Sequence, residues 1–252
     1  MQHQARSLFY LTPDWPAPTN VRAMSTCRGL TSHEQATGLA GFNLARHVQD
    51  DLAQVELHRL QLQQDLGLEH QPFWLNQTHS TNLLSLPASV GEYAVDGSFT
   101  QTKNWPCVVM TADCLPVLLC NAAGTQVAAV HAGWQGLASG IIAKAIAQFR
   151  EPAQVLVWLG PAIGPTAFEV GPNVLEAFDV DLCEVSEEFT RIATKPNKWL
   201  GNLYALARKE LAGLGVTQVF GGDYCTYSAP QQFYSHRRDP ASGRMASLIW
   251  IS

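Results

Sequence analysis

The sequence lacks several features that mark secreted, membrane-embedded and nucleic-acid-binding proteins. No apolar run is long enough to cross a bilayer, and residues 1–6 are polar, without the apolar segment of a secretory signal. There is no basic excess, because 16 Lys and Arg stand against 21 Asp and Glu, for a formal net charge of −5. A nucleic-acid surface would need the opposite balance. We therefore expect a cytoplasmic protein that binds neither membrane nor nucleic acid.

The sequence also lacks any linker rich in proline, glycine or charge, and it shows no internal repeat. Its 252 residues, 46% hydrophobic and 15% charged, are enough to bury a substantial core. We predict one domain over residues 1–252.

The six cysteines contain no CxxC pair and follow no secretory signal, so a disulfide framework is not expected. Cys107 and Cys120 lie inside apolar runs and are interpreted as small buried hydrophobic residues. Cys114 differs, because Asp113 precedes it and Pro116 follows two residues later. Cys114 is therefore the candidate functional cysteine.

Short apolar runs bounded by turn residues predict strands along the whole chain, with helices of moderate length between them. Strands are expected at residues 7–14, 21–27, 107–110, 117–120, 126–130, 154–159, 217–220, 233–238 and 244–251. A further short strand is expected inside 91–99, and residues 94–97, which include Asp96, are interpreted as the turn at its end. Helical spacing is found at residues 48–66, 137–149, 173–178 and 203–211. Residues 30–41 and 187–199 are expected to be loops, the second with Lys195, Lys198 and Trp199 exposed. This alternation predicts an α/β fold.

Soft metal ligands follow three of the apolar runs. His79 comes after the apolar residues 72–75, Cys114 follows the run 107–110, and His131 ends the run 126–130. Strand exits tolerate irregular backbone, so side chains from different strands can converge there. Two imidazoles and a thiolate suit Zn²⁺, and three protein ligands leave the fourth tetrahedral position open. Separations of 35 and then 17 residues are not those of a structural zinc finger, so we predict an open, catalytic zinc site.

The same residues allow other interpretations. A Cys114 thiolate with His131 as its base, oriented by Asp113, would make a cysteine hydrolase dyad. Alternatively, the cysteine is buried and the histidines are satisfied by hydrogen bonds without a catalytic role. A multinuclear copper cluster is not expected, because copper centres favour histidine-rich sets and the eight histidines include no His-x-His pair.

Two features suggest an anion-binding site. Arg237 and Arg238 are adjacent on an expected strand, so their side chains should point to opposite faces. One is expected to enter the cleft and the other to make a structural ion pair. The helix that starts near Leu137 presents free backbone N–H groups beside His131. Three further histidines are interpreted as surface or helix-face residues: His47, His58 and His70.

Longer motifs carry a family resemblance over residues 79–252 and, more weakly, over 42–48. The motifs are QTHS at 77–80, DG at 96–97, TADCLPVLL at 111–119, HAGWQG at 131–136, GPAIGPTAFEVG at 160–171, DYCT at 223–226 and YSHRRDPASGRMASLIW at 234–250. Together they resemble the laccase-domain family, also called multicopper polyphenol oxidoreductase, purine nucleoside phosphorylase or peptidoglycan editing factor.

The resemblance implies a four-layer α/β/β/α fold with mixed sheets, similar to the cytotoxic-necrotising-factor-like cysteine hydrolases. It also implies a zinc held by His79, Cys114 and His131, with Cu²⁺ as the other candidate metal. Family activities include phosphorolysis of adenosine, inosine and methylthioadenosine, adenosine deamination, copper-dependent phenol oxidation, and removal of a mis-incorporated serine from peptidoglycan precursors. The chain departs from the family pattern at Gln135, where arginine is usual, and at residues 25–30, where a glycine-rich threonine–arginine motif is degraded.

We predict a zinc-dependent enzyme that acts on purine nucleosides by phosphorolysis and deamination, as a monomer with small-molecule substrates. The predicted catalytic residues are Cys114, His131, Asp113 and Glu169, with the two carboxylates as proton carriers. The predicted substrate-binding residues are Gln77, Gln135, Arg237 and Arg238. The alternatives are a hydrolase that edits cell-wall precursors with Cys114 as nucleophile, a copper-dependent polyphenol oxidase, and a non-catalytic metal-binding protein.

Overall fold

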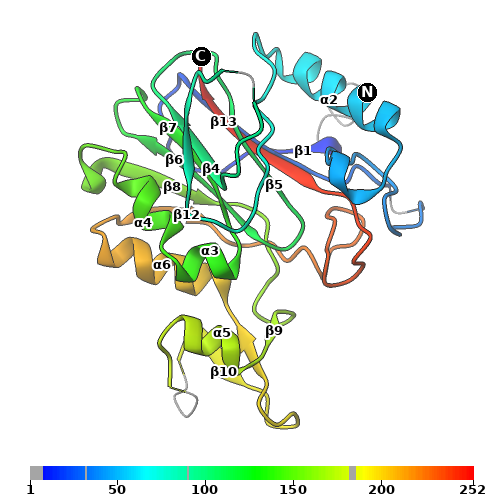
Figure 1. Cartoon of the computed structure of the whole chain (residues 1–252), viewed down its shortest axis with the longest axis vertical. Coiled ribbons are helices and arrows are strands. Elements are labelled where there is room, and N and C mark those ends of the chain that lie inside the picture. Colours follow the sequence, from blue (N-terminus) through cyan, green and yellow to red (C-terminus); the bar gives the residue numbers. More distant parts are fainter. Residues whose placement is uncertain (1–7, 32, 90, 182–185) are drawn as a thin grey trace.

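The computed structural model describes residues 8–31, 33–89, 91–181 and 186–252. Two β-sheets pack against each other, and helices cover their outer faces (Figure 1). The larger sheet has six strands in the order β12-β8-β6-β7-β4-β3. Strand β6 runs antiparallel to both of its neighbours, whereas β12 runs parallel to β8 and β3 runs parallel to β4. These strands are β3 (Leu83–Leu86), β4 (Gly97–Thr100), β6 (Leu115–Asn121), β7 (Val127–Ala132), β8 (Val155–Leu159) and β12 (Gln218–Gly221).

The second sheet is antiparallel and has four strands in the order β1-β2-β13-β5. Its central strand β13 comes from the C-terminal end of the chain and pairs with β2 from the N-terminal part. The strands are β1 (Tyr10–Leu11), β2 (Val21–Thr26), β5 (Cys107–Thr111) and β13 (Met245–Ile251).

Each of the two sheets is covered by helices from a different part of the chain. Helix α2 (Leu52–Leu66) packs on the four-stranded sheet, where its Leu62 meets Val108 and Leu248. The outer face of the six-stranded sheet is covered by α3 (Trp134–Ala138), α4 (Ile141–Ile146) and α6 (Leu203–Gly213). Figure 1 shows α5 (Pro172–Ala177) at one end of the molecule with a small sheet of β9 (Glu169–Val170), β10 (Phe189–Arg191) and β11 (Trp199–Gly201). Short 3₁₀ helices lie at Arg46–Val48 and Pro152–Gln154.

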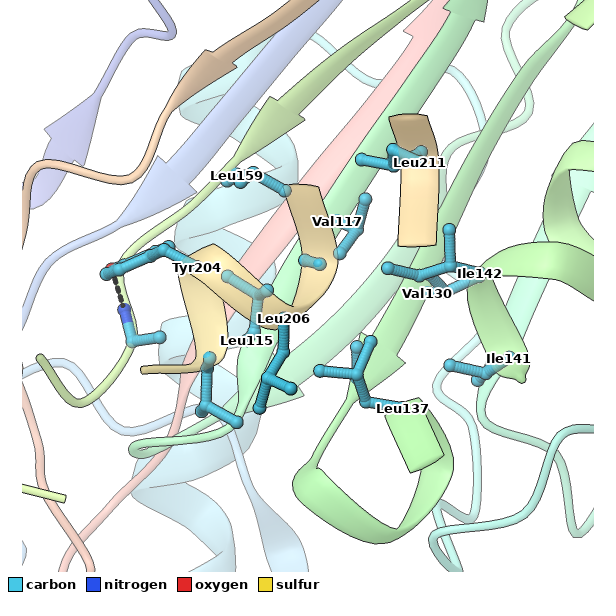
Figure 2. Packing of buried hydrophobic residues seen from close by; sticks show 14 of the residues in the cluster. Leu115, Val117, Val130, Leu137, Ile141, Ile142, Leu159, Tyr204, Leu206 and Leu211 are labelled. Atoms are coloured by element: carbon cyan, nitrogen blue, oxygen red, sulfur yellow. Dashed lines mark hydrogen bonds between the residues drawn. The ribbon is translucent and has the colours of Figure 1, made fainter. Parts of the chain in front are cut away.

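Side-chain alternation along the central strands assigns each residue to one of two cores. In β6, Leu115, Val117 and Leu119 pack with the helices, whereas Leu118 and Cys120 face the four-stranded sheet. Both faces are apolar, which explains why these strands are continuous hydrophobic runs in the sequence. Figure 2 shows the helix-side core, in which Leu115, Val117 and Val130 of the sheet meet Leu137, Ile141, Ile142, Leu206 and Leu211 of the helices.

Four predictions about elements differ from the structure. The helix expected over 137–149 is divided into α3 and α4, because Gly140 has a φ of +83° and interrupts the helical geometry. Residues 233–235 are irregular and residues 236–238 form a turn instead of a strand, and the Asp239 N–H donates to the Ser235 carbonyl at 2.9 Å. Trp199 is 1% exposed, not an exposed loop residue, because β11 lies between β9 and β10 and contributes to the core. Of the strand expected at 7–14, β1 contains only Tyr10–Leu11, and residue 7 lies outside the described residues.

The predicted α/β class, with mixed sheets, is confirmed. The four-layer description and the likeness to cytotoxic-necrotising-factor-like cysteine hydrolases stay predictions. Within the described ranges, none of the helices combines the length and the apolarity that crossing a bilayer requires.

Leu118 tests the core between the two sheets, because its side chain is 0% exposed there. Leu118→Ala should lower the free energy of unfolding by about 2–5 kcal/mol, since the substitution removes buried methyl groups and leaves a cavity. Leu57→Ala, on the 59% exposed side chain of α2, is the control and should change it by no more than about 0.5 kcal/mol. Urea unfolding measures the free energy of unfolding of both variants. Equal losses in Leu118→Ala and Leu57→Ala would contradict the burial of Leu118 between the two sheets.

Candidate metal and active site

Three potential metal ligands converge where β5, β6 and β7 end or begin. The ligand atoms of His79, Cys114 and His131 all lie within 4.8 Å of one another, and Cys114 Sγ is 3.8 Å from His79 Nε2. The two imidazole rings meet edge to face with their centroids 4.9 Å apart. The structure therefore brings together the three ligands that the sequence predicted.

Strand geometry places Cys114 and His131 on the same face. β6 and β7 pair antiparallel with Pro116 opposite His131, and Cys114 lies two residues before Pro116. Asp113, just before Cys114, has a φ of +93°, a backbone conformation that turns the chain sharply between β5 and β6. The hairpin and this turn together aim the thiol at the imidazole.

Gly133 leaves room for the cluster. It follows β7, and a Cβ at this position would lie 2.8 Å from His79 Cδ2 and 3.0 Å from Cys114 Sγ. Carbon atoms in contact are normally about 3.5–4.0 Å apart. Any side chain here would therefore displace two of the three ligands.

A buried aspartate holds the loop that carries His79. Asp96 is 0% exposed, and its carboxylate accepts hydrogen bonds from the backbone N–H groups of Thr78 (3.1 Å), His79 (2.9 Å) and Ser80 (2.6 Å). The Ser80 hydroxyl donates to it as well, at 2.8 Å. These contacts fix the loop in which His79 adopts a φ of +60°. The sequence interpretation missed this role and assigned Asp96 to a turn, although the Asp-Gly motif of the family resemblance contains it.

The same carboxylate orients His131, whose Nδ1 lies 2.9 Å from Asp96 Oδ1. Since an ionised carboxylate only accepts, Nδ1 carries a proton, and in the neutral imidazole that binds a metal Nε2 is left with the free lone pair. Metal-binding histidines commonly donate their second ring N–H to a carboxylate in this way.

Opposite charges perturb the pKa values of this cluster. Burial alone would raise the pKa of Asp96, but the hydrogen bonds from His131 and Ser80 outweigh it and lower the pKa to about 2. Burial also disfavours the Cys114 thiolate, yet His131 and His79 bring the pKa of the thiol below its ordinary value. Burial likewise disfavours a charged His131, but Cys114 and Asp96 raise its pKa. The site thus favours the thiolate, which is the form that binds metals and attacks electrophiles.

The donor set fits a zinc ion. In a tetrahedral site with Zn–S near 2.3 Å and Zn–N near 2.0–2.1 Å, ligand atoms lie about 3.3–3.7 Å apart. The 3.8 Å between Cys114 and His79 is close to this spacing. Imidazole and thiolate also bind copper, so the arrangement indicates a metal site that suits either ion.

A cavity of about 200 Å³ opens onto the three ligands. Its lining includes Gln77 and also three residues that the sequence interpretation did not select: His47, His236 and Arg244. His47 was expected to be a surface residue, while His236 and Arg244 belong to the C-terminal motif of the family resemblance. Their proximity depends on tertiary contacts between β13, the preceding turns and the 3₁₀ helix at Arg46–Val48, which no local pattern reveals.

Asp113 does not face this cavity. Its carboxylate accepts hydrogen bonds from the hydroxyls of Thr226 (2.6 Å) and Ser235 (3.0 Å) and from the Arg237 N–H (2.6 Å). Both carboxylate oxygens of Asp113 are thus engaged outside the cavity, and the proton-carrier role that the sequence suggested stays a prediction.

Three other predicted residues are occupied or distant. Gln77 lines the cavity, but its amide pairs with the backbone of Met110, donating to the carbonyl at 2.8 Å and accepting the N–H at 2.7 Å. Gln135 is exposed on α3 and is not part of the cavity lining. Glu169 lies in β9 outside the cavity, with its carboxylate oxygens 2.6 Å from Lys195 Nζ and 3.8 Å from Lys198 Nζ.

The adjacent arginines bind backbone carbonyls of the protein itself. Arg237 Nη1 donates to a carbonyl of β9 at 2.9 Å. Arg238 donates to three carbonyls, those of Thr226 (2.7 Å), Tyr227 (2.8 Å) and Phe233 (2.7 Å). Neither arginine lines the cavity, and within the described residues neither makes the predicted ion pair. The reason is local: residues 236–238 form a turn, so the two side chains do not alternate as they would in a strand.

Asp96→Asn should weaken zinc binding about 10–100-fold, because it removes the charge that orients His131. Asp14→Asn, at an exposed position, is the matched control. Competition with a chromogenic chelator measures the affinity, and unchanged binding in Asp96→Asn would contradict this role.

The lowered pKa of Asp96 also predicts how the stability of the fold depends on pH. Its folded-state pKa is lowered from 3.8 to about 2, so the carboxylate stabilises the fold above about pH 4. This stabilisation should be lost as the pH falls from about 4 to about 2, and less so in Asp96→Asn. Unfolding midpoints measured across this range compare the two proteins.

Gly133→Ala should abolish stoichiometric zinc binding, because the new methyl group would overlap His79 and Cys114. Gly213→Ala is the control, since a Cβ there would meet no atom within 4 Å. Elemental analysis of both purified variants gives the answer, and a full zinc content in Gly133→Ala would refute the packing argument.

Comparisons with known proteins agree with the motifs. The family model described as multi-copper polyphenol oxidoreductase laccase matches residues 22–252. A purine nucleoside phosphorylase of Haemophilus influenzae is 42% identical over 245 residues, which cover 96% of this chain and 98% of that protein. The purine nucleoside phosphorylase YfiH of Escherichia coli K12 is 44% identical over 244 residues, with the same coverage of 96% and 98%.

Solved structures show the same fold. The Neisseria meningitidis protein NMB0706 matches with a TM-score of 0.86 at 44% identity, covering 96% of this chain and 99% of that one. A Bacillus licheniformis protein named YfiH matches with a TM-score of 0.82 at 26% identity, covering 92% and 93%. The mixed α/β single-domain fold and the predicted family are therefore confirmed, and the chain belongs to the multi-copper polyphenol oxidoreductase laccase family.

Proposed function

We propose that the protein is a zinc-dependent purine nucleoside enzyme in which residues 1–252 act as one domain. It cleaves adenosine, inosine and methylthioadenosine with phosphate, releasing the base and the 1-phosphate of the sugar, and it also deaminates adenosine. One observation carries the proposal: His79, Cys114 and His131 converge on a cavity, with His131 oriented by a buried carboxylate. Relatives named purine nucleoside phosphorylase, 42% and 44% identical, support an enzyme and this substrate class.

In this proposal the residues around the cavity have separate roles. His79, Cys114 and His131 would hold the zinc, which when bound supplies a Lewis acid. Asp96 keeps His131 in the tautomer that presents Nε2 to the ion. A cavity of about 200 Å³ suits the reacting part of a small molecule.

Phosphorolysis forms a bond between a phosphate oxygen and C1′ of the sugar while the C1′–N9 bond breaks. The electron pair of that bond leaves with the purine, which must gain a proton. His47 and His236 line the cavity and are groups that can donate it. They replace Asp113 and Glu169 as candidate proton carriers. Deamination adds water at purine C6 and releases ammonia, and it needs the same proton transfers without phosphate.

A second candidate function uses Cys114 as a nucleophile to remove mis-incorporated serine from peptidoglycan precursors. The lowered pKa of the thiol beside His131 favours it. In that case a bound metal would occupy the thiolate, so chelation should activate the hydrolase and inactivate the nucleoside enzyme.

Copper-dependent phenol oxidation would require copper at the same three ligands. Within the described residues, these ligands form the one cluster of at least three His, Cys, Asp or Glu with metal-binding geometry. A copper-dependent oxidase of this fold would therefore have to work with a single copper ion at His79, Cys114 and His131.

Purified protein should contain about one zinc per chain and should release base from inosine in a phosphate-dependent reaction that chelation abolishes and zinc restores. His79→Ala should lose both metal and activity, because it removes one of three ligands. His70→Ala, at an imidazole that stacks on Trp105 with a 4.3 Å centroid distance, is the control. Elemental analysis and a base-release assay measure the outcome. Chelator-resistant phosphorolysis would contradict the zinc mechanism, and hydrolysis of muramyl-serine precursors by the chelated protein alone would favour editing.

A further inference from the structure

Arg244 contributes a guanidinium group to the lining of the cavity that contains the three metal ligands. It immediately precedes β13, which pairs with β5 so that Met245 lies opposite Thr111. Arg244 is therefore level with Ala112, two residues before Cys114, and both Arg244 and Ala112 line the cavity. The register of the four-stranded sheet thus fixes an arginine beside the metal ligands.

The Arg244 side chain is anchored on one side and free on the other. Its backbone N–H donates to Asn43 Oδ1 at 2.9 Å, and its Nη1 donates to the carbonyls of Ser242 (2.6 Å) and Gly243 (3.0 Å). In the part of the chain that the structure describes, Nε and Nη2 have no hydrogen-bond partner and no carboxylate lies within 4.0 Å of the guanidinium. This combination leaves a planar pair of donors available to an oxyanion.

This arrangement differs from that of Arg28 and Arg238, which are buried and half-buried. Arg28 and Arg238 each donate to three backbone carbonyls, which stabilise loops. The Arg244 guanidinium instead carries a charge that lacks full compensation. Burial lowers the pKa of Arg244, and the negative charges of Cys114 and Asp113 oppose that shift.

Two histidines lie beside Arg244 in the cavity lining. His236 Nδ1 is 3.1 Å from the Pro240 carbonyl, which can only accept, so Nδ1 carries a proton and Nε2 is available to a ligand. His47 is close enough for the positive charge of Arg244 to help lower its pKa, although burial is the larger cause. An anion between these groups would relieve that repulsion.

We propose that Arg244, with His236 and His47, forms an oxyanion subsite that holds the phosphate co-substrate beside His79, Cys114 and His131. The assignment rests on the proposed phosphorolysis and transfers the phosphate contact from Arg237, Arg238 and Gln135 to Arg244. A carboxylate could use the same donors, so phosphate and acetate have to be compared directly.

The test uses zinc-loaded Arg244→Gln and Arg244→Lys. Losing the charge should raise the phosphate KM of inosine phosphorolysis about tenfold or more, since a charge-assisted hydrogen bond becomes a neutral one. The inosine KM and the zinc content should stay within about twofold, and Arg244→Lys should be intermediate. Arg22→Gln, on an exposed arginine of β2, is the control and should match the wild type. An unchanged phosphate KM in Arg244→Gln would overturn the proposal.

Calorimetry with inorganic phosphate and with acetate separates this subsite from the proposed function. Phosphate binding that disappears in Arg244→Gln supports the subsite even if the wild type cleaves no nucleoside. Absence of phosphate binding to the wild type, or preference for acetate, overturns the phosphate assignment. If Arg244→Gln melts well below the wild type, Arg244→Lys becomes the deciding variant, because it keeps the positive charge and should retain measurable phosphate binding. If a stable Arg244→Lys binds phosphate no better than Arg244→Gln does, positive charge at this position is not what recognises phosphate, and the proposal is overturned.

Discussion

The burial of one carboxylate is the constraint on which the candidate site depends. A buried charge is unfavourable unless hydrogen bonds and opposite charge compensate it, and Asp96 is fully buried. Three successive backbone N–H groups and the His131 imidazole supply that compensation. The same contacts hold His79 in a left-handed conformation and fix the tautomer of His131. The hydrogen bonds that compensate the buried Asp96 carboxylate are therefore the same contacts that position His79 and His131.

The two-sheet architecture gives this requirement a rigid frame. Residues of β6 and β7 alternate between a helix-side core and an inter-sheet core. A shift of either strand by one residue would therefore move every side chain into the other core, where it does not fit the packing. Cys114 and His131 belong to the inter-sheet face. Their mutual position is thus set by packing that extends well beyond the ligands, and it is complemented by Gly133, where the backbone must pass without a side chain.

The sequence predicted what depends on residue type and local pattern. Apolar runs located β5, β6, β7 and β8, and ligand chemistry at strand exits selected His79, Cys114 and His131. It did not predict what depends on distant segments. Asp96 looked like a turn residue because its partners lie in another loop and another strand, and Arg244 was overlooked because its role follows from sheet register. Trp199 was expected to be exposed because β11 is only three residues long and its cover comes from separate segments. Arg237 and Arg238 were misplaced because turns replaced the expected strand.

The hairpin of β6 and β7 has a consequence for the order in which the ligands can assemble. Cys114 and His131 flank a single antiparallel pair joined by a short turn, so closing this local loop brings a thiol and an imidazole together at a small loss of chain entropy. His79 joins only when the loop before β3 docks on Asp96, which requires the parallel pairing of β3 and β4 and the pairing of β4 with β7. The hairpin thus supplies the local contact between Cys114 and His131, whereas the position of His79 depends in addition on pairings between strands that are distant in the sequence.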